Sequence, residues 1–331
     1  MKYSFIIPVY NRPDEIEELL ESLVHLSSSI PFEVVVVEDG SSISCKHIVD
    51  LYAKQLHISY YYKTNSGPGD SRNYGMKVAK GSYFIILDSD CIIPPNYLVE
   101  VDTFLSNSFV DFFGGPDAAH KSFSNIQKAI DCVMTSVFTT GGIRGSSEKL
   151  SKFQPRSFNM GISKKAFEAS GGFGKIHPGE DPDLTIRLWK LGFKSALIPN
   201  AYVFHKRRID WKKFYQQVKK FGKARPILNY RYPEHDKLMY WFPTIFILGY
   251  ILSIIFLLIG FSLPIIIYIL YFLAISIESL IKTQSIGIAL LTIWATHIQF
   301  FGYGLGFFIS SFKIKILKEK PELAMPEMFF K

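Results

Sequence analysis

The sequence predicts an α/β domain built on a largely parallel sheet, followed by a membrane-associated helical region. In the N-terminal part of the chain, apolar β-prone runs alternate with helical patterns, which is typical of a parallel sheet covered by helices. Further on, 40 consecutive positions from 238 to 277 contain no Asp, Glu, Lys or Arg, and neither do the 30 positions from 283 to 312. A wholly soluble protein is therefore excluded.

Each element of the N-terminal part is predicted from its residue pattern. Strands are expected at 4–9, 33–38, 58–63 and 83–87. Helices are expected at 13–26, 45–55 and 69–79. In such sheets ligands bind beyond the carboxyl ends of the strands, so the residues that follow each strand are the first candidates for a functional site.

Charge is distributed unevenly along the chain. Residues 1–202 hold 20 basic and 22 acidic side chains, a net charge of −2, whereas residues 203–237 hold 11 basic and 3 acidic, a net charge of +8. Because the basic segment adjoins the first apolar run, attraction to anionic lipid headgroups explains it better than nucleic-acid binding. Its position also predicts that the N-terminal domain is cytoplasmic, with the protein in the cytoplasmic membrane.

The N-terminal stretch and the cysteines predict a domain that is neither exported nor disulfide-bonded. The first apolar stretch is too short for a signal peptide and is followed by Arg12 and two acids without a small-residue cleavage site. The cysteines at 45, 91 and 132 are widely spaced and form no Cys-x-x-Cys pattern. Neither a disulfide framework nor a structural zinc site is expected.

Polar residues follow the first, second and fourth strands, at 8–11, 38–42 and 88–90. Any one of these sequences is explained equally well as a turn or a helix cap, but all three together favour a site. Asp88 and Asp90 would project from a buried strand end, and such close carboxylates need a cation. Mg²⁺ or Mn²⁺ bound to a substrate diphosphate satisfies them, and Arg72 is a candidate phosphate partner.

Taken together, these blocks resemble a family 2 glycosyltransferase, an inverting nucleotide-sugar enzyme with the GT-A fold, a Rossmann-like nucleotide-diphospho-sugar transferase domain. The resemblance covers residues 1 to about 205. The matching blocks follow the family's order at 4–11, 34–42, 72–75, 86–90 and 179–181. Five blocks in order are specific, whereas a single Asp-x-Asp is not.

The resemblance implies roles for the residues at the strand ends. Pro8, Tyr10 and Asp39 line the nucleotide pocket, with Asp39 accepting hydrogen bonds from the base or ribose. Asp88 contacts ribose or metal, and Asp90 is a metal ligand. For Tyr10 an ordinary aromatic core position is the competing interpretation.

The resemblance assigns the acceptor half of the site to later residues. The acids at 180, 181 and 183 could simply favour the positive N-terminus of the helix expected at 182–191. In the family, the second acid of Glu-Asp is the general base, so Asp181 takes that role and Glu180 supports it. His205, at the end of a short strand, is a further metal ligand by position, with a structural histidine as the competing interpretation. Asn159 and Met160 resemble the acceptor-side wall.

The expected reaction is a single in-line displacement that moves one sugar from a nucleotide sugar, a UDP-sugar above all, to a hydroxyl of the acceptor. The expected acceptor is a lipid-linked molecule or a glycan of cell-envelope polysaccharide biosynthesis. Mg²⁺ or Mn²⁺ would hold the departing diphosphate.

The run at 217–221 loosely resembles the Gln-x-x-Arg-Trp signature of processive polysaccharide synthases, but both diagnostic residues differ. A nucleotidyltransferase is disfavoured because the N-terminal glycine-rich basic loop is missing, and a degenerate membrane scaffold is disfavoured because the acids are intact.

The expected organisation has a GT-A catalytic domain, a basic interfacial segment, a transmembrane region and a basic tail, at 1–205, 206–237, 238–312 and 313–331. Apolar helices are expected at 241–261, 264–281 and 286–312. These make three crossings, or two and a re-entrant or interfacial piece. Three crossings would place the lysines of the tail outside, against the positive-inside tendency, and an even count would return them to the cytoplasm.

Overall fold

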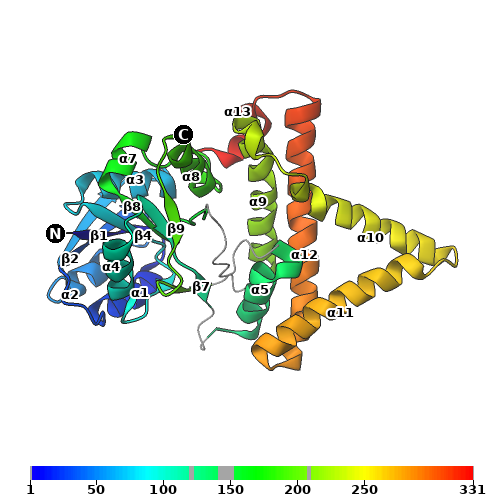
Figure 1. Cartoon of the computed structure of the whole chain (residues 1–331), viewed down its shortest axis with the longest axis horizontal. Helices are drawn as coiled ribbons and strands as arrows, with labels where there is room; N and C mark the ends of the chain where they lie inside the picture. The colour runs from blue at the N-terminus through cyan, green and yellow to red at the C-terminus, as the bar shows by residue number, and fades with distance from the viewer. Residues whose placement is uncertain (1, 119–122, 141–152, 207–209, 331) are drawn as a thin grey trace. The chain divides into compact units, whose positions relative to one another are not determined.

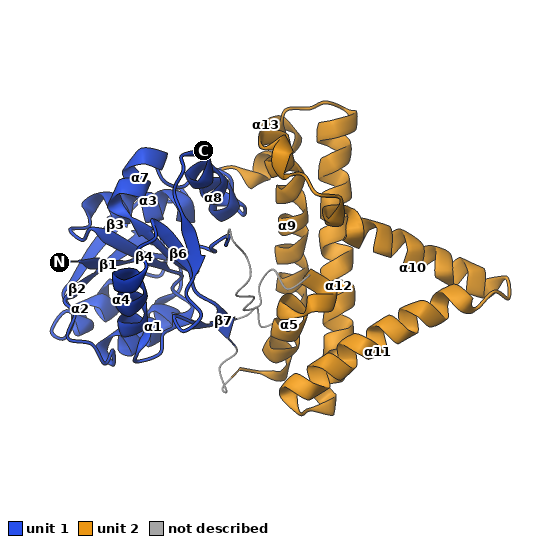
Figure 2. Cartoon of the chain, viewed as in Figure 1, with its two compact units in different colours: residues 1–120, 146–206, 330–331 blue, residues 121–145, 207–329 orange. Residues whose placement is uncertain are grey.

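The structure, a computed structural model, describes residues 2–118, 123–140, 153–206 and 210–330. The chain forms two compact units (Figure 2). The first, which we call the sheet unit, comprises residues 1–120, 146–206 and 330–331. The second, the helical unit, comprises residues 121–145 and 207–329. Arg207 and Arg208 of the basic segment lie outside the described residues.

The sheet unit is built on a seven-stranded mixed sheet (Figure 1). Its strands, in order across the sheet, are β3 (Ile58–Lys63), β2 (Phe32–Asp39), β1 (Tyr3–Val9), β4 (Tyr83–Leu87), β8 (Asn159–Ser163), β6 (Phe112–Gly114) and β9 (Ser195–Leu197). The first four strands of the chain are the predicted ones and run parallel. β8 runs antiparallel to β4 and β6, a direction that local sequence does not encode. The α/β prediction is confirmed.

Helices cover both faces of this sheet, because alternate strand residues point to opposite sides. On one face, Phe5, Ile7 and their neighbours pack with α1 (Pro13–Val24), α2 (Lys46–Tyr52) and α4 (Tyr97–Asn107). On the other face, Ile6, Phe84 and Ile86 pack with α3 (Pro68–Val78), α7 (Lys164–Ser170) and α8 (Glu180–Lys190). The central strands are buried on both sides, which explains their continuous apolar sequence.

A second, three-stranded sheet joins segments that are far apart in sequence. Its order is β5 (Cys91–Ile92), β10 (Val203–His205) and β7 (Asp117–Ala118). In its register His205 lies opposite Cys91, and Val203 lies opposite Asp117. This small sheet therefore brings the end of the Asp88–Asp90 segment next to His205.

The helical unit contains α5 (Asn125–Thr135), α6 (Val137–Thr140), α9 (Trp211–Arg231), α10 (Phe242–Leu258), α11 (Leu263–Thr283), α12 (Ile286–Ser311) and α13 (Pro321–Ala324). Its core joins α5, α9 and α12 through Ile130, Val133, Phe214, Val218 and Ala295. α5, which precedes residue 205, therefore packs against helices that follow it. The predicted domain boundary at residue 205 stays a prediction. Among the described residues, three helices are long and apolar enough to cross a membrane, at Leu238–Leu258, Leu263–Thr283 and Ile286–Ile316.

Candidate active site

The loop after β1 is fixed to the loop after β2 by one asparagine. Asn11 has a left-handed backbone with φ 53°, a conformation that Asn tolerates better than most residues. Its Oδ1 accepts hydrogen bonds from the backbone N–H groups of Ser42 at 2.7 Å and Ile43 at 3.1 Å. Pro8 lies just before this loop, opposite Val37 in β2. Tyr10 is 51% exposed, so it is not an aromatic core residue.

Asp39 is buried at the end of β2 and organises the loop before α3. One carboxylate oxygen accepts hydrogen bonds from Lys63 Nζ at 2.7 Å and the Ser66 N–H at 3.0 Å. The other oxygen accepts from the Gly67 N–H at 2.9 Å. Both oxygens are thus held by protein donors, and each retains lone-pair capacity for a further donor.

Arg72 joins the acid after β4 to the first acid of α8. Its guanidinium is 3% exposed and donates from Nη2 to Asp88 Oδ1 at 2.7 Å and from Nη1 to Glu180 Oε1 at 3.0 Å. It also lies 5.3 Å from the ring centre of Phe173. A buried guanidinium needs such anionic partners, so this contact fixes the end of β4 against the start of α8.

Asp90 lies between an arginine and the histidine of β10. Its Oδ2 accepts a hydrogen bond from Arg12 Nη1 at 2.7 Å, and its Oδ1 lies 3.2 Å from His205 Nε2. The His205 ring stacks on Phe158, with ring centres 4.7 Å apart. Asp88, by contrast, points to Arg72. The structure thus pairs Asp90 with His205 and places Asp88 elsewhere in the site.

The surroundings of Asp90 fit a divalent cation. Among the described residues, Asp90, Cys91 and His205 form a group whose potential ligand atoms all lie within 4.8 Å of one another. Burial and the nearby carboxylates raise the pKa of Cys91, which keeps it a thiol and a poor ligand. The remaining carboxylate oxygen and imidazole nitrogen suit Mn²⁺ or Mg²⁺, with further oxygens supplied by a diphosphate.

The two acids at the start of α8 differ in their environment. Glu180 is buried and contacts Arg72 and, at 3.0 Å, His177 Nδ1. Burial alone raises the pKa of Glu180, but His177, Arg72 and their hydrogen bonds lower it to about 2. Asp181 is only partly buried, and Arg156 Nη1 lies 3.6 Å from its Oδ2. Glu180 therefore holds the helix in place while Asp181 is accessible.

Known proteins resemble this chain in sequence and in structure. Residues 4–168 match the family model described as Glycosyl transferase family 2. This part of the chain belongs to family 2 of the glycosyltransferases. A family 2 domain is a glycosyltransferase domain, so residues 4–168 are assigned to the glycosyltransferase class.

Solved structures support the GT-A fold of this glycosyltransferase domain. A mannosyltransferase from Pyrobaculum calidifontis, solved with GDP-Man and Mn²⁺, superposes with a TM-score of 0.54. The superposition covers 67% of this chain and 62% of that chain at 18% identity, which establishes the fold and nothing finer. The predicted GT-A fold is confirmed.

Curated relatives match the glycosyltransferase domain over short stretches. TarS of Staphylococcus aureus strain Mu50, named a poly(ribitol-phosphate) beta-N-acetylglucosaminyltransferase, is 38% identical over 114 residues, which is 34% of this chain and 20% of TarS. A poly(ribitol-phosphate) beta-glucosyltransferase of Bacillus spizizenii is 32% identical over 155 residues, 43% of this chain and 24% of that protein. The chain thus spans at most a quarter of the length of these relatives.

The two residues expected at the acceptor side of the glycosyltransferase site are both fully buried. The Asn159 side chain donates to the carbonyl oxygen of Ala201 at 2.8 Å and accepts from the hydroxyl of Tyr97 at 2.6 Å. Met160 belongs to the apolar core. Neither side chain reaches the surface of the site, so their burial does not support a contact with acceptor.

Several residues of the site were missed by sequence reasoning, namely Arg12, Arg156, His177 and Phe330. Phe330 belongs to the sheet unit, where its N–H donates to the carbonyl oxygen of Lys175 at 3.0 Å and its ring centre lies 5.8 Å from that of His177. The ring lies so close to Gly67, which has φ 95°, that a Cβ there would clash with it. For Arg12, Arg156 and His177 the only sequence signal is their proximity to the predicted site residues. Phe330 has no such signal, because it lies far from all of them in the sequence.

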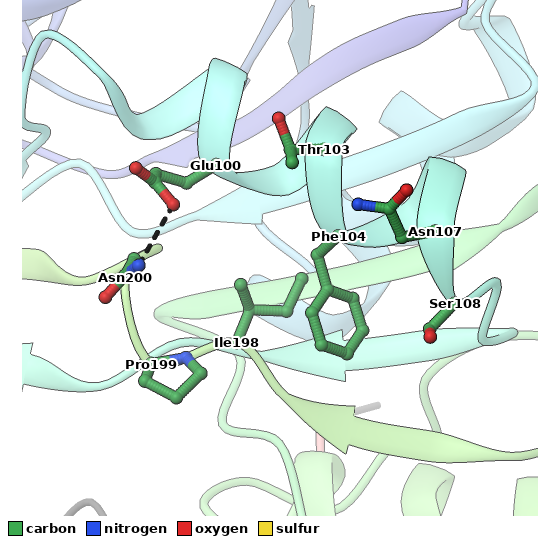
Figure 3. Close-up of a pocket in the computed structure, with 8 residues that line it drawn as sticks. All are labelled: Glu100, Thr103, Phe104, Asn107, Ser108, Ile198, Pro199 and Asn200. Atoms are coloured by element: carbon green, nitrogen blue, oxygen red, sulfur yellow. Dashed lines mark hydrogen bonds between the residues drawn. The ribbon is translucent and has the colours of Figure 1, made fainter.

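A shallow pocket lies elsewhere on the sheet unit, between α4 and the residues after β9 (Figure 3). Phe104, Ile198 and Pro199 form its apolar part, and Asn200 donates to Glu100 Oε2 at 3.1 Å at its rim. Glu100 is the one charged residue among those that line it, and Asp39, Asp88, Asp90 and Asp181 lie elsewhere. It is a surface depression without the cluster of acids described for the candidate site.

Proposed function

We propose that this chain transfers one sugar from a nucleotide-sugar donor, a UDP-sugar, to a hydroxyl of a membrane-associated glycan or lipid-linked acceptor, with inversion of configuration and with a divalent cation. The observation that carries the proposal is the Arg72 contact. One buried guanidinium connects Asp88 with Glu180, so it holds the predicted donor half and acceptor half of the site together.

The donor half supports nucleotide binding. Asp39, the half-exposed Tyr10 and the backbone around Gly67 belong to loops that adjoin one another after β1, β2 and β3. A carboxylate already oriented by three donors is preorganised to accept one more from a base or ribose, at little cost in conformational entropy. Pro8, Arg72 and Asp88 complete the proposed donor-binding set.

The acceptor half supports general-base catalysis by Asp181. In the proposed step an acceptor hydroxyl oxygen forms a bond to the anomeric carbon while the bond from that carbon to the diphosphate oxygen breaks. The electron pair of that bond leaves with the nucleoside diphosphate, and the hydroxyl proton passes to a carboxylate oxygen of Asp181. Attack from the face opposite the leaving group inverts the anomeric centre.

A cation would be held by Asp90 and His205, whose ligand atoms lie together. When bound, it supplies positive charge that stabilises the departing diphosphate. Arg12 already places one fixed positive charge on Asp90. We therefore expect Arg12 to share this carboxylate with the metal.

The acceptor and location are proposed from the rest of the chain. Three apolar helices could cross a membrane, and the basic α9 precedes them. The curated relatives named above act, by their names, on poly(ribitol-phosphate). An acceptor of the cell-envelope polysaccharide class at the cytoplasmic membrane fits these features, with the catalytic domain in the cytoplasm.

The proposal is tested by nucleoside diphosphate release from a panel of nucleotide sugars, using the purified full chain with Mn²⁺ or Mg²⁺ and with a lipid extract as acceptor. Two variants on the same helix make a matched pair. Asp181→Asn removes the proposed base and should lower kcat by about 10²–10⁴-fold with an unchanged Tm. Asp183→Asn makes the same chemical change where the carboxylate pairs with Arg187 at 3.0 Å, so it should lower Tm and retain turnover.

Either of two results would contradict the proposal: Asp181→Asn with wild-type turnover, or product release that is unaffected when the metal is chelated. Product analysis by mass spectrometry separates single-sugar transfer from polymer formation. A product with the donor's anomeric configuration would refute inversion.

A further inference from the structure

The start of α10 and the end of α12 lie close together in the helical unit. Lys315, which follows α12, forms an ion pair with Asp236, which precedes α10, at 2.7 Å. Three successive membrane crossings would instead place these two ends on opposite sides, about 30 Å apart. The ion pair is therefore incompatible with α10, α11 and α12 all crossing the bilayer.

α12 forms the base of a triangle whose other sides are α10 and α11 (Figure 1). Near the start of α10, the Thr244 hydroxyl donates to the carbonyl oxygen of Gly304 at 3.0 Å. Near the end of α11, the Ser279 and Thr292 hydroxyls are 2.8 Å apart. Positions 292 and 304 are separated by about 18 Å along a helix, because each residue rises about 1.5 Å. The hairpin formed by α10 and α11 therefore stands across α12 rather than parallel to it.

The α10–α11 hairpin does not reach across the bilayer when its helices lean. α10 has 17 residues and a length of about 25 Å, and α11 has 21 residues and a length of about 32 Å. The hydrocarbon core is about 30 Å thick, and a helix that leans reaches a smaller depth than its length. The tip of the hairpin would consequently end inside the hydrocarbon.

The tip is chemically suited to hydrocarbon. It is an Ile-Gly-Phe-Ser sequence at 259–262, within the 40-residue stretch that lacks charged side chains. Gly260, with φ 89°, reverses the chain, its N–H donates to the carbonyl oxygen of Leu257 at 3.0 Å, and the Phe261 N–H donates to that of Phe256 at 2.8 Å. These two backbone bonds keep the Gly260 and Phe261 donors paired within the chain, which lowers the cost of placing the turn away from water.

The residues at the base of the hairpin are typical of a protein surface that contacts a membrane. α12 packs closely on α9 through glycines, since a Cβ at Gly306 would clash with the backbone of Lys219. The α12 side chains Leu290, Trp294, Leu305 and Phe308 are exposed, as is Phe312 directly after the helix. The exposed lysines of α9, at 212, 213 and 220, add positive charge for anionic headgroups. Tyr240 and Trp241, where α10 begins, are residue types that favour the interface.

We propose that α10 and α11 form a re-entrant hairpin that enters a lipid bilayer and returns to the same face, while α12 lies along that face. The partner of this surface is a bilayer that contains anionic lipid. The inference rests on the proposed membrane location of the enzyme and adds how it is bound there. The lysines after α12 and the residues before α10 then share one aqueous compartment, as the positive-inside tendency requires.

The test uses the full chain in sealed vesicles whose cytoplasmic face is outward, with a membrane-impermeant maleimide. Single cysteines replace three exposed residues: Lys237→Cys before the hairpin, Ser262→Cys at its tip and Lys320→Cys after α12. The chain without substitutions is the blank, because its own cysteines are buried. We expect the variants at 237 and 320 to label equally, and the variant at 262 to label less than a tenth as much until SDS is added.

Two outcomes overturn the inference. Labelling at 320 that requires detergent while labelling at 237 does not would establish an odd number of crossings. Labelling at 262 in vesicles of the opposite orientation would establish that the tip reaches the other side. The labelling readout needs no catalysis, so an inactive chain does not affect it. If a carbonate wash removes the chain from the vesicles, the membrane location in the proposed function is itself contradicted.

Discussion

Asp39 and Asp181 belong to the proposed donor half and the proposed acceptor half of the site, and they differ in their hydrogen-bond partners and burial. Asp39 is 3% exposed and accepts hydrogen bonds from one lysine and two backbone N–H groups. Asp181 is more open, and Arg156 is 3.6 Å from it. A carboxylate fixed by several donors recognises a partner in one orientation, whereas an accessible carboxylate can receive a proton. The difference supports the proposed roles, which are donor binding for Asp39 and general-base chemistry for Asp181.

Arg72 forms ion pairs with Asp88 in the proposed donor half and with Glu180 in the proposed acceptor half. Removing its guanidinium should have the largest effect on stability. Arg72→Met leaves the buried carboxylate of Glu180 without its guanidinium partner. We expect the free energy of unfolding to fall by about 3–5 kcal/mol, measured by urea denaturation. Arg156→Met is the matched control, because its partly exposed pair should cost less than about 1 kcal/mol. Equal losses for the two variants would show that Arg72 does not join the halves.

Replacing Asp90 should lower turnover and change the stability of the fold little. Asp90→Ala removes the proposed metal ligand, while Arg12 keeps its ion pair with Glu15 at 2.6 Å. We expect kcat to fall by about 10²–10³-fold, as for the loss of one stabilising group on a leaving group, with a small change in Tm. Asp50→Ala, which removes an exposed carboxylate paired with Lys46, is the control and should retain full activity. Wild-type turnover of Asp90→Ala, or a large fall in Tm, would reject the metal assignment.

Replacing Glu180 should lower the free energy of unfolding by a smaller amount, and that amount should depend on pH. Its pKa in the folded protein is lowered from 4.5 to about 2, so its charge stabilises the fold above pH 4.5 and that stabilisation is lost as the pH falls towards 2. Glu180→Gln should therefore lower the free energy of unfolding at pH 7 by about 1–3 kcal/mol. Denaturation at pH 7 and pH 3 measures the difference, which should shrink at pH 3. A difference that stays constant would mean that the charge of Glu180 contributes nothing.

Much of the donor half could be predicted because its signals are local. The strand that ends at Leu87 is wholly apolar and the acids follow at once, so position along the chain gives position in space. The same holds for Asp39 after β2. His205 was placed beside Asp90 through the family resemblance, and the structure brings the two together.

The rest could not be predicted because it depends on packing between distant segments. Arg12 reaches Asp90 across 78 positions, and its place directly after the 4–11 block does not indicate which acid it contacts. For Asn159 and Met160 the motif matched but the side chains are buried, because β8 lies between β4 and β6 with helices and core on both faces. Local pattern gives the strand, whereas neighbouring strands decide which side chains reach solvent.

The three-stranded sheet of β5, β10 and β7 has a consequence for how the enzyme matures. Its strands come from residues near 91, 117 and 203, so the pairing of Asp90 with His205 closes a loop of more than a hundred residues. Contacts of such long range form late, after local helices and adjacent strands. A nascent chain that ends before β10 would hold the strands of the seven-stranded sheet but would lack the His205 side of the proposed cation site, so we expect that site to form last.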